Sequence, residues 1–273
     1  MPIITISRGS YSWGKEVAEK AAQKLGYKCI AREVLIEASE QFNIPEIRLL
    51  QAIHDAPSFV DQFIHGKEKE KYITYFQAVL LKQAKEDKMV YHGLAGHFFL
   101  KDISHVLKVR IIADFNDRVK LVTKRDRLSR SEAIAFLKKI DDQRRRWSLS
   151  LYDIDTWDAS LYDMVLHIKK ITVDDAVDFI CNAVGLKQFQ TTPESKKKLL
   201  DLALAAEVKA ALVNLKPDVD VSAHDGIVLV RTGAQKWQES KLVSKIRGIV
   251  ETIPGVKDIE VQVLSSRRVK GWS

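Results

Sequence analysis

The stretch that most constrains this chain is the loop GSYSWGKE, residues 9–16, close to its N-terminus. A short apolar run, Ile3 to Ile6, precedes the loop, and an amphipathic helical pattern with Val17, Ala21 and Leu25 on one face follows it. Strand, glycine loop and helix form the context in which backbone N–H groups and a helix N-terminus converge on a phosphate. The loop therefore predicts a nucleotide phosphate site at the end of the first strand.

The loop fits the phosphate-binding pattern G-x-x-x-x-G-K, although Glu16 stands where a Ser or Thr usually follows the lysine. That hydroxyl normally contacts Mg²⁺. Glu16 could ligate Mg²⁺ directly or could be an acidic residue stabilised by the helix N-terminus, and Ser10 or Ser12 could supply the missing hydroxyl. The residues that we expect to contact the phosphates of a bound nucleotide are Gly9, Ser10, Ser12, Gly14, Lys15 and Glu16. The motif alone leaves an ordinary strand–turn–helix connection open as the alternative.

A charged run later in the chain, DDQRRRW (residues 141–147), is the second candidate for a phosphate contact. It ends a helix that a capping box, Ser129 and Glu132, begins. Arginine suits phosphate because its planar guanidinium donates hydrogen bonds in pairs. Neighbouring arginines on a helix point in different directions, so one or two of the three could face a single site. The alternative is a solvated helix end whose cations complement the helix dipole.

Composition argues against several other classes of protein. A net charge of +8 over 273 residues permits an anionic partner. The basic residues are scattered along the whole chain, and no face is expected to form a phosphate-binding track with interleaved aromatic residues, so specific nucleic-acid binding is not expected. The two cysteines, Cys29 and Cys181, lie in apolar contexts typical of free thiols, and no apolar run reaches the ~20 residues of a membrane span. No secretory signal begins the sequence, and we therefore expect a cytoplasmic protein.

The order of elements predicts the fold class. Apolar strand patterns alternate with helical patterns, which is typical of a doubly wound parallel α/β sheet. Strands are expected at residues 3–6, 27–30, 89–91, 106–113 and 164–168, and helices over most of residues 34–86. The polar segment 187–196 contains Pro193 and lacks periodicity, so it predicts a linker. Beyond it we expect a small α-β-β-α-β unit over residues 197–266, with its first helix at 199–212, and a basic tail over residues 267–273.

Together these segments resemble the cytidylate kinase-like family of P-loop kinases over residues 1–186. The resemblance lies in the order and spacing of several segments, namely ITISRGSYSWGKEVAEKAAQKLGY, AREVL, VYHGLAGHFFL, VLKVRIIADFNDRVKLV, IDDQRRRW and SLYDMVLHIKKITVDDAVDFI. It implies a P-loop kinase fold with a helical insertion and a lid. It also implies transfer of the γ-phosphoryl group of ATP, with Mg²⁺, to a nucleoside monophosphate or a related small phosphorylated acceptor.

The same resemblance implies roles for individual residues. Residues 35–88 would form the acceptor-binding insertion, and Arg125 to Trp147 would form the lid. The catalytic residues would be Lys15, Arg125 and Arg144, and the residues in contact with the acceptor would be Arg32 and Gly93. Such chemistry depends on positioning and on charge neutralisation, so the cations and the metal matter more than a general base.

The chain departs from the family's pattern at four positions that matter for the site. Trp13 replaces a small residue in the phosphate loop, where an indole is expected to crowd the phosphates. Around the acceptor, Leu94 stands where the family tends to have an arginine, and Ala31 and Ala95 stand where acidic residues are usual. We therefore expect the donor site to be better preserved than the acceptor site. An active phosphotransferase and a degenerate nucleotide-binding regulatory module both stay open.

The C-terminal unit, residues 197–266, resembles a BON domain in its element order and in the segments HDGIVLV and IPGVKDIEVQVL. That resemblance implies a partner, either a protein or a membrane surface. In the regulatory alternative, the kinase-like domain would sense a nucleotide and the BON-like domain would pass that state on.

Overall fold

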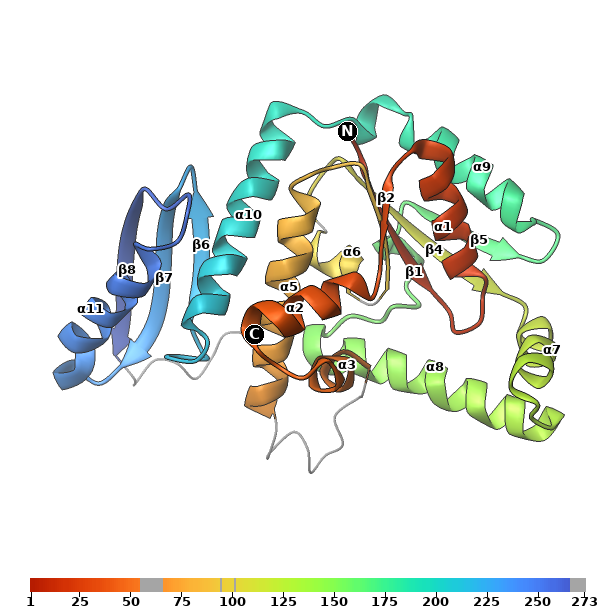
Figure 1. The fold of residues 1–273 in the computed structure, drawn as a ribbon, viewed down its shortest axis with the longest axis horizontal. Coiled ribbons are helices and arrows are strands. Elements are labelled where there is room, and N and C mark those ends of the chain that lie inside the picture. Colours follow the sequence, from red (N-terminus) through yellow and green to blue (C-terminus); the bar gives the residue numbers. More distant parts are fainter. Residues whose placement is uncertain (55–65, 94, 101, 266–273) are drawn as a thin grey trace.

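A five-stranded parallel sheet forms the centre of the larger part of the molecule (Figure 1). The computed structural model describes residues 1–54, 66–93, 95–100 and 102–265. The strands are β1 (Ile3–Arg8), β2 (Lys28–Ile30), β3 (Met89–His92), β4 (Val106–Ala113) and β5 (Met164–Ile168), in the order β2-β3-β1-β4-β5. The predicted parallel α/β sheet is confirmed. Because the chain crosses over β1 between β3 and β4, the crevice for a ligand is expected at the carboxyl ends of β1 and β4.

Helices cover both faces of this sheet, as its alternating apolar side chains require. The face that presents Ile4 and Ile6 is covered by α1 (Gly14–Leu25) and α9 (Val173–Val184). The face that presents Ile3 is covered by α2 (Glu33–Phe42), α3 (Glu46–His54), α5 (Gly66–Ala84), α6 (Gly96–Phe99) and the C-terminal part of α8 (Arg130–Tyr152). With α7 (Phe115–Asp126), the N-terminal half of α8 forms an arm that extends beyond the sheet (Figure 1). Among the described helices, none has the length and apolar character that crossing a bilayer requires.

Capping residues begin and end several of these helices where the sequence predicts it. Gly26 ends α1 with a φ of 66°, the left-handed conformation that suits glycine. Ser129 and Glu132 form the capping box of α8, and Thr172 and Asp175 form that of α9. These local hydrogen bonds explain why the bounds of these helices follow from sequence alone.

A second, three-stranded sheet lies at the C-terminal end of the described chain. Its strands are β6 (Asp220–His224), β7 (Ile227–Ala234) and β8 (Asp258–Ser265), in the order β6-β7-β8. Asp225 and Gly226, with φ values of 52° and 84°, form the predicted turn between antiparallel β6 and β7. Strand β8 pairs with β7 in parallel after the crossover helix α11 (Glu239–Val250). With α10 (Pro193–Leu212) in front, the observed element order is α-β-β-α-β.

Helix α10 starts earlier than the sequence analysis predicts. The Thr192 side chain accepts a hydrogen bond from the backbone N–H of Ser195, and Pro193 occupies the first helical position. The segment 187–196, for which a linker is expected, therefore contains a 3₁₀ turn, Lys187–Phe189, and the first residues of α10. The polar residues at the end of this segment cap α10, and a helix cap has no apolar periodicity. A polar run of this kind can therefore indicate a helix start as well as a linker.

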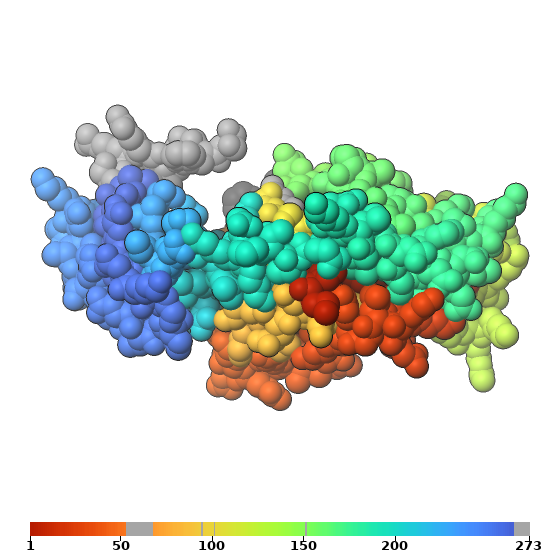
Figure 2. Space-filling view, turned by 90° about the horizontal axis from the view of Figure 1, so that it is seen from above, coloured from red at the N-terminus to blue at the C-terminus, as the bar shows by residue number. Residues whose placement is uncertain are grey.

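Helix α10 belongs to two hydrophobic cores at once. Leu199, Ala203 and Ala206 pack into the core of the larger sheet, next to α5. Val208 and Leu212 belong instead to the core of the small sheet. Figure 2 shows α10, in teal, between the small sheet and the larger part of the molecule.

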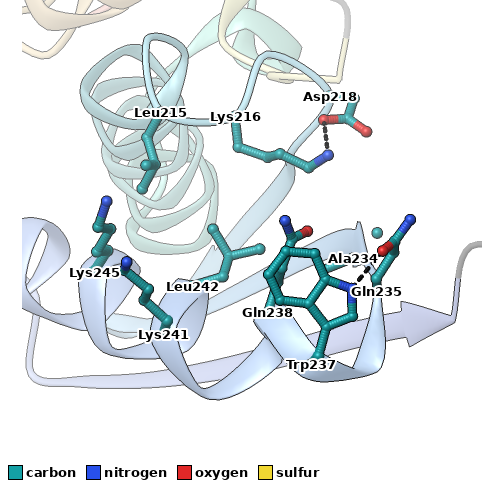
Figure 3. Close-up of a pocket in the computed structure, with 11 residues that line it drawn as sticks. Leu215, Lys216, Asp218, Ala234, Gln235, Trp237, Gln238, Lys241, Leu242 and Lys245 are labelled. Atoms are coloured by element: carbon teal, nitrogen blue, oxygen red, sulfur yellow. Dashed lines mark hydrogen bonds and ion pairs between the residues drawn. The ribbon is translucent and has the colours of Figure 1, made fainter.

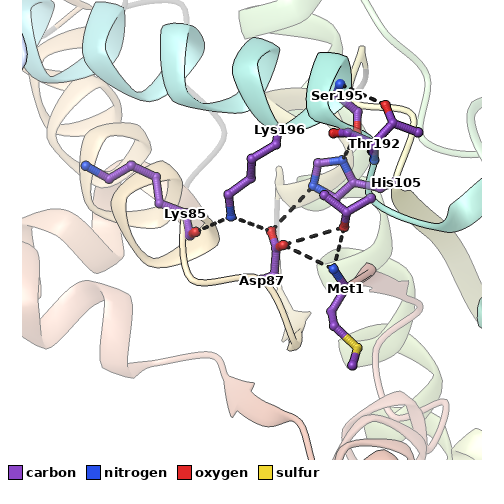
Figure 4. A network of polar contacts seen from close by, with 8 residues as sticks. Met1, Lys85, Asp87, His105, Thr192, Ser195 and Lys196 are labelled. Atoms are coloured by element: carbon purple, nitrogen blue, oxygen red, sulfur yellow. Dashed lines mark hydrogen bonds and ion pairs between the residues drawn. The ribbon is translucent and has the colours of Figure 1, made fainter.

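Polar contacts centred on Asp87 tie the N-terminal end of α10 to the larger part of the molecule (Figure 4). The Asp87 carboxylate lies 3.0 Å from Lys196 Nζ and 3.2 Å from the amino group of Met1. His105, fully buried, places its Nδ1 atom 2.8 Å from Ser195 Oγ. Burial lowers the pKa of His105 and so favours the neutral imidazole at pH 7. The hydrogen bond between His105 and Ser195 is therefore one between two uncharged groups.

Leu199 gives a direct test of the shared helix. Replacing Leu199 by Ala should lower the free energy of unfolding by about 2–5 kcal/mol, because the side chain is fully buried in the larger core. Leu200, which is 44% exposed on the same helix, is the matched control, and Leu200→Ala should change the free energy by only about 0.5 kcal/mol. Urea unfolding followed by circular dichroism measures both. Similar effects for the two variants would contradict the packing of α10 on the larger core.

Candidate functional site

The glycine loop between β1 and α1 is held in shape by bonds to the end of β4. The backbone N–H of Gly9 donates to the carbonyl of Ile111 at 3.0 Å. Ser12 is fully buried, and its Oγ lies 2.8 Å from the Gly9 carbonyl and 3.0 Å from the Ile111 carbonyl. The Ser12 hydroxyl is therefore engaged by backbone. Ser10 Oγ, in contrast, is buried and has no hydrogen-bond partner among the described residues, which leaves it available to a ligand of the loop.

Gly14 is required by its neighbour Arg8. A Cβ atom at Gly14 would lie 2.6 Å from Arg8 Cβ and 2.9 Å from Arg8 Cδ, closer than carbon atoms approach in proteins. The absence of a side chain at Gly14 thus allows the Arg8 stem to pass beneath the first turn of α1. This contact links the second glycine of the motif to an arginine that the sequence analysis did not single out.

Two residues of the loop have the left-handed backbone conformation without being glycine. Tyr11 and Trp13 have φ values of 57° and 61°, which cost roughly 1–3 kcal/mol each. Contacts of both side chains offset that cost. Trp13 packs part of its surface against the core beneath α1 and also lines the space over the loop, so the expected crowding of the phosphates stays a prediction. Tyr11 accepts a hydrogen bond from Arg125 Nη2 at 2.7 Å, and the Arg125 guanidinium lies 4.4 Å from the centre of its ring.

A pocket of about 440 Å³ lies over this loop, and we call it the loop pocket. Its lining residues are Arg8, Ser10, Tyr11, Ser12, Trp13, Gly14, Lys15, Glu16, Glu19, Leu121, Arg125, Ile140 and Arg144. The fold thus brings the predicted phosphate-binding residues, except Gly9, to the same pocket as the predicted catalytic ones. Lys15 is exposed and lies 3.6 Å from Glu19, and Glu16 lies 3.2 Å from Lys20. Lys15 thus has a surface ion pair that costs little to exchange for a phosphate, whereas Lys20 lies outside the pocket and also pairs with Asp174 at 2.9 Å.

Arg144 is the one arginine of the RRR run that enters the site. It is half-buried, and its Nη1 donates to the carbonyl of Arg8 at 3.1 Å. Burial lowers the pKa of Arg144 to about 10, and the positive charge of Arg8 acts in the same direction. Arg145 instead forms a two-pronged ion pair with Asp155. Arg146 is exposed and pairs with Asp142 at 2.9 Å. Arg145 and Arg146 therefore agree with the solvated helix end, whereas Arg144 lines the pocket over the loop, and its contact with a phosphate stays a prediction.

Two further buried arginines lie close by, and sequence reasoning missed them. Arg110 on β4 donates through Nη1 to Ser7 Oγ at 3.3 Å and to Tyr162 Oη at 3.2 Å. Arg118 on α7 donates through Nη2 to both carboxylate oxygens of Asp141, at 2.9 and 2.8 Å. Arg110 is a buried charged residue within a largely apolar strand, whose other charged residue, Lys108, is only half-buried. Such a charge requires a partner or a ligand, and that was the signal available in the sequence.

The arginine cluster, which we define as Arg8, Arg110, Arg118 and Arg144, carries more positive charge than its protein neighbours balance. The carboxylate that accompanies it is Asp141. Burial also lowers the pKa of Arg8, whose Nε has no hydrogen-bond partner among the described residues. Arginine nevertheless stays charged at neutral pH. A buried excess of guanidinium groups at the carboxyl edge of a sheet is suited to an anion with several oxygen atoms.

Two smaller spaces connect this cluster to the loop. A pocket of about 290 Å³, the β4 pocket, is lined by Gly9, Arg110, Arg118, Asp141 and Trp157, with Ile112, Ala113, Ala159 and Val165. A bridging cavity of about 30 Å³ lies between it and the loop pocket, and Arg110 and Asp141 also line this cavity. Arg8 and Arg144 line both the loop pocket and the bridging cavity. The arrangement can hold two anionic groups side by side, with these two arginines between them.

The two predicted acceptor residues lie away from these pockets. Arg32 is exposed and pairs with Glu46 at 2.6 Å. Gly93 follows β3, where a Cβ atom would lie 2.4 Å from Tyr91 Oη. Leu94 lies outside the described residues. Ala95 is buried with a φ of 65° and lines the bridging cavity, and the backbone N–H of Ala31 donates to Glu33 at 2.7 Å.

The carboxylates of the loop pocket fit a magnesium ion that arrives with a nucleotide. Among the described residues, no three His, Cys, Asp or Glu side chains are grouped so that they could hold a metal by themselves. Glu16 and Glu19 line the loop pocket next to the space for phosphates. Mg²⁺ usually keeps several water ligands and takes one or two carboxylates together with phosphate oxygens. This set of donors meets that requirement, with Glu16 at the start of α1.

Two buried histidines lie close to the arginines of the site, and one of them, His97, lines the bridging cavity. His92 ends β3, and burial lowers its pKa to about 4, with Arg8 and Lys15 acting in the same direction. His97 on α6 lies 3.3 Å from Tyr162 Oη through its Nε2, and burial lowers its pKa to about 3. Both imidazoles are therefore neutral in the folded protein at any pH near 7.

Comparison with known proteins relates this site to a family of kinases. The model of the cytidylate kinase-like family matches residues 3–170. The cytidylate kinase of Archaeoglobus fulgidus is 27% identical over 190 residues, which cover 68% of this chain and 97% of that enzyme. The cytidylate kinase of Pyrobaculum islandicum is 26% identical over 114 residues, or 40% of this chain and 61% of that enzyme. A solved structure of an uncharacterized protein from Eubacterium ventriosum ATCC 27560 has a similar fold, with a TM-score of 0.50, 22% identity, and coverage of 67% of this chain and 98% of that one.

The two buried histidines predict a loss of stability in mild acid. Unfolded histidine binds a proton near pH 6.5, whereas His92 and His97 do so only near pH 4 and pH 3 when folded. Below pH 6.5 the unfolded state binds more protons, so the free energy of unfolding should fall by up to about 1.4 kcal/mol per pH unit for each histidine. Urea unfolding at pH 7.5, 6.0 and 5.0 measures this slope.

The control is the double variant His92→Asn, His97→Gln. Because neither replacement titrates, this variant should lose less stability than the unmodified protein between pH 6.5 and 5. An equal slope in the two proteins would show that these histidines are not the source of the acid sensitivity.

Proposed function

This chain belongs to the cytidylate kinase-like family, and we propose that it is an ATP-dependent phosphotransferase acting on a nucleoside monophosphate or a related small phosphorylated acceptor. The observation that carries the proposal is the arginine cluster beside the glycine loop, in which Arg110 and Arg118 are buried and Arg8 and Arg144 are half-buried. Structural ion pairs would leave such arginines balanced by carboxylates. Among the described residues, Asp141 is the only carboxylate that lines the β4 pocket or the bridging cavity, beside four guanidinium groups, whereas Glu16 and Glu19 line the loop pocket. The missing negative charge is what two phosphorylated substrates would supply.

The loop pocket is the proposed donor site. Backbone N–H groups of the loop and the N-terminus of α1 would contact the β- and γ-phosphates of ATP. Lys15 would exchange Glu19 for a phosphate oxygen, and Arg125 would lie at the pocket mouth above Tyr11. Mg²⁺ would be held by the phosphates with Glu16 as its protein ligand, and it would neutralise part of the charge on the transferred group.

Transfer would take place across the wall that Arg8 and Arg144 share. Two phosphates that approach each other repel, and the charge of the transferred group spreads over its oxygen atoms in the transition state. Guanidinium groups already fixed in a buried site stabilise that charge without reorganisation. Arg144 is fixed by its hydrogen bond to the Arg8 carbonyl, so its position is set before substrates bind.

The β4 pocket is the proposed site for the acceptor's phosphate, with Arg110 and Arg118 as its ligands. Arg32 and Gly93 follow β2 and β3 at the same carboxyl edge of the sheet. We retain them as candidates for contact with the remainder of the acceptor. This division places the acceptor's phosphate nearer to β4, and its other groups nearer to β2 and β3.

A second candidate function is nucleotide binding without transfer. It is favoured by Tyr11 and Trp13, which occupy left-handed positions of the loop, and by the contact of Tyr11 with Arg125. In this alternative the C-terminal unit would read the bound state. We propose that this unit is a BON-like domain, following residues 1–186 and a connection at 187–196, because its α-β-β-α-β order agrees with that assignment. A protein or membrane partner for it is part of this second proposal.

The two functions are separated by an assay of phosphoryl transfer from Mg·ATP to a panel of nucleoside monophosphates. We expect turnover that Lys15→Ala abolishes. Arg144→Gln should lower kcat about 10²–10³-fold, because it removes the guanidinium charge that lines both the loop pocket and the bridging cavity. Arg146→Gln is the matched control on the same helix and should leave kcat within about twofold, as expected for an exposed residue.

ATP binding, measured by calorimetry on the same proteins, decides what a negative assay means. ATP binding that Lys15→Ala weakens, without turnover on any acceptor, would favour the binding module. Neither binding nor turnover would overturn both functions. Equal losses in Arg144→Gln and Arg146→Gln would contradict the special position of Arg144.

A further inference from the structure

A pocket of about 710 Å³ opens in the C-terminal unit, outside the proposed phosphotransfer site. Its walls come from the turn after α10, from the end of β7 and from the first two turns of α11 (Figure 3). The lining residues are Leu215, Lys216, Asp218, Gly233, Ala234, Gln235, Trp237, Gln238, Lys241, Leu242 and Lys245. Its volume lies within the range of about 300–1,000 Å³ that is typical of small-molecule sites.

Two lysines of this pocket have no counter-charge. Lys241 and Lys245 are exposed, lie one helical turn apart on α11, and have no acidic partner among the residues that the structure describes. Like charges at this spacing repel each other on an isolated helix. Lys216, on the opposite wall, is paired with Asp218 at 3.1 Å. The pocket therefore presents a net positive charge on the side of α11.

An aromatic surface lies opposite these lysines. Trp237 is 75% exposed, an unusual state for the largest apolar side chain. Its indole Nε1 already donates to Gln235 Oε1, so the polar edge of the ring is satisfied and its face is left for a ligand (Figure 3). Leu242 lies between the tryptophan and the lysines, Leu215 adds apolar lining on the wall that follows α10, and the amide group of Gln238 lies beside the ring.

We propose that this pocket binds a small phosphorylated molecule with a planar ring, that is, one with the chemistry of a nucleotide. The ring would stack on Trp237 and the phosphates would lie between Lys241 and Lys245. Proteins that bind nucleotides irrespective of base identity combine stacking on an exposed aromatic ring with contacts from cationic side chains to the phosphates. A concave pocket favours a molecule that can enter it over a flat bilayer surface. The inference does not rest on the proposed phosphotransferase activity, because no residue of the loop pocket takes part.

Tryptophan fluorescence of the full chain tests the proposal. Subtracting the titration of Trp237→Phe from that of the unmodified protein isolates the signal of Trp237. ATP should quench this signal with saturation. The double variant Lys241→Glu, Lys245→Glu should weaken the saturating response by about tenfold or more, because both cations become anions. Lys257→Glu, on an exposed lysine of the same unit outside the pocket, should leave it unchanged.

Further ligands separate the two parts of the recognition. Adenosine, which lacks phosphates, and tripolyphosphate, which lacks a ring, should each bind at least about tenfold more weakly than ATP, since each forgoes one set of contacts. Tripolyphosphate binding as tightly as ATP would overturn the stacking role of Trp237. Vesicles of phosphatidylglycerol and phosphatidylcholine are the alternative ligand. A Lys241-dependent response to the vesicles, with none to ATP, would overturn the proposal and assign the surface to a membrane.

The loop variant Lys15→Ala keeps this test independent of the proposed function. The Trp237 response to ATP should persist in Lys15→Ala, even if that variant abolishes phosphoryl transfer. Loss of the response in Lys15→Ala would place the ATP in the loop pocket and overturn the second site. A response that persists in a protein without kinase activity would still support it.

Discussion

Two hydrogen bonds from arginine to backbone carbonyls set the geometry of the whole site. Arg144 on α8 donates to the carbonyl of Arg8, and Arg118 on α7 donates through Nε to the carbonyl of Ser10 at 2.7 Å. Hydrogen bonds from a charged donor contribute about 1.5–3 kcal/mol each. They join the arm made by α7 and α8 to the loop between β1 and α1. A change in the position of the arm therefore changes the shape of the loop, and the reverse also holds.

This coupling accounts for the tolerance of the loop to two large residues. The Tyr11 side chain packs against the small apolar cluster of the arm, where the centre of its ring lies 5.9 Å from that of Phe136. Trp13 turns part of its surface toward the core beneath α1 instead. Each side chain thus gains packing where glycine would gain only conformational freedom. A loop with these residues is stiff, and its N–H groups are already arranged when a ligand arrives.

Much of the fold could be predicted from sequence because local patterns determine it. The strands at 106–113 and 164–168 and the capping boxes at Ser129 and Thr172 depend on neighbours within a few residues. The glycine loop was found for the same reason. The arginine cluster was only partly found, since Arg8, Arg110 and Arg118 meet Arg144 through tertiary contacts between β1, β4, α7 and α8. An isolated arginine within a strand carries no sign of what it will face, beyond the fact that its charge must be met.

The double membership of α10 has a thermodynamic consequence. Because residues of α10 belong to both cores, α10 stays folded as long as either core is intact. The larger sheet and the small sheet therefore have part of their unfolding in common, although they share no strand. Anything that binds only the native form of either one adds its binding free energy to the stability of that common element. We therefore expect the two sheets to unfold together, so that a ligand bound at one end of the molecule also raises the free energy of unfolding of the other end.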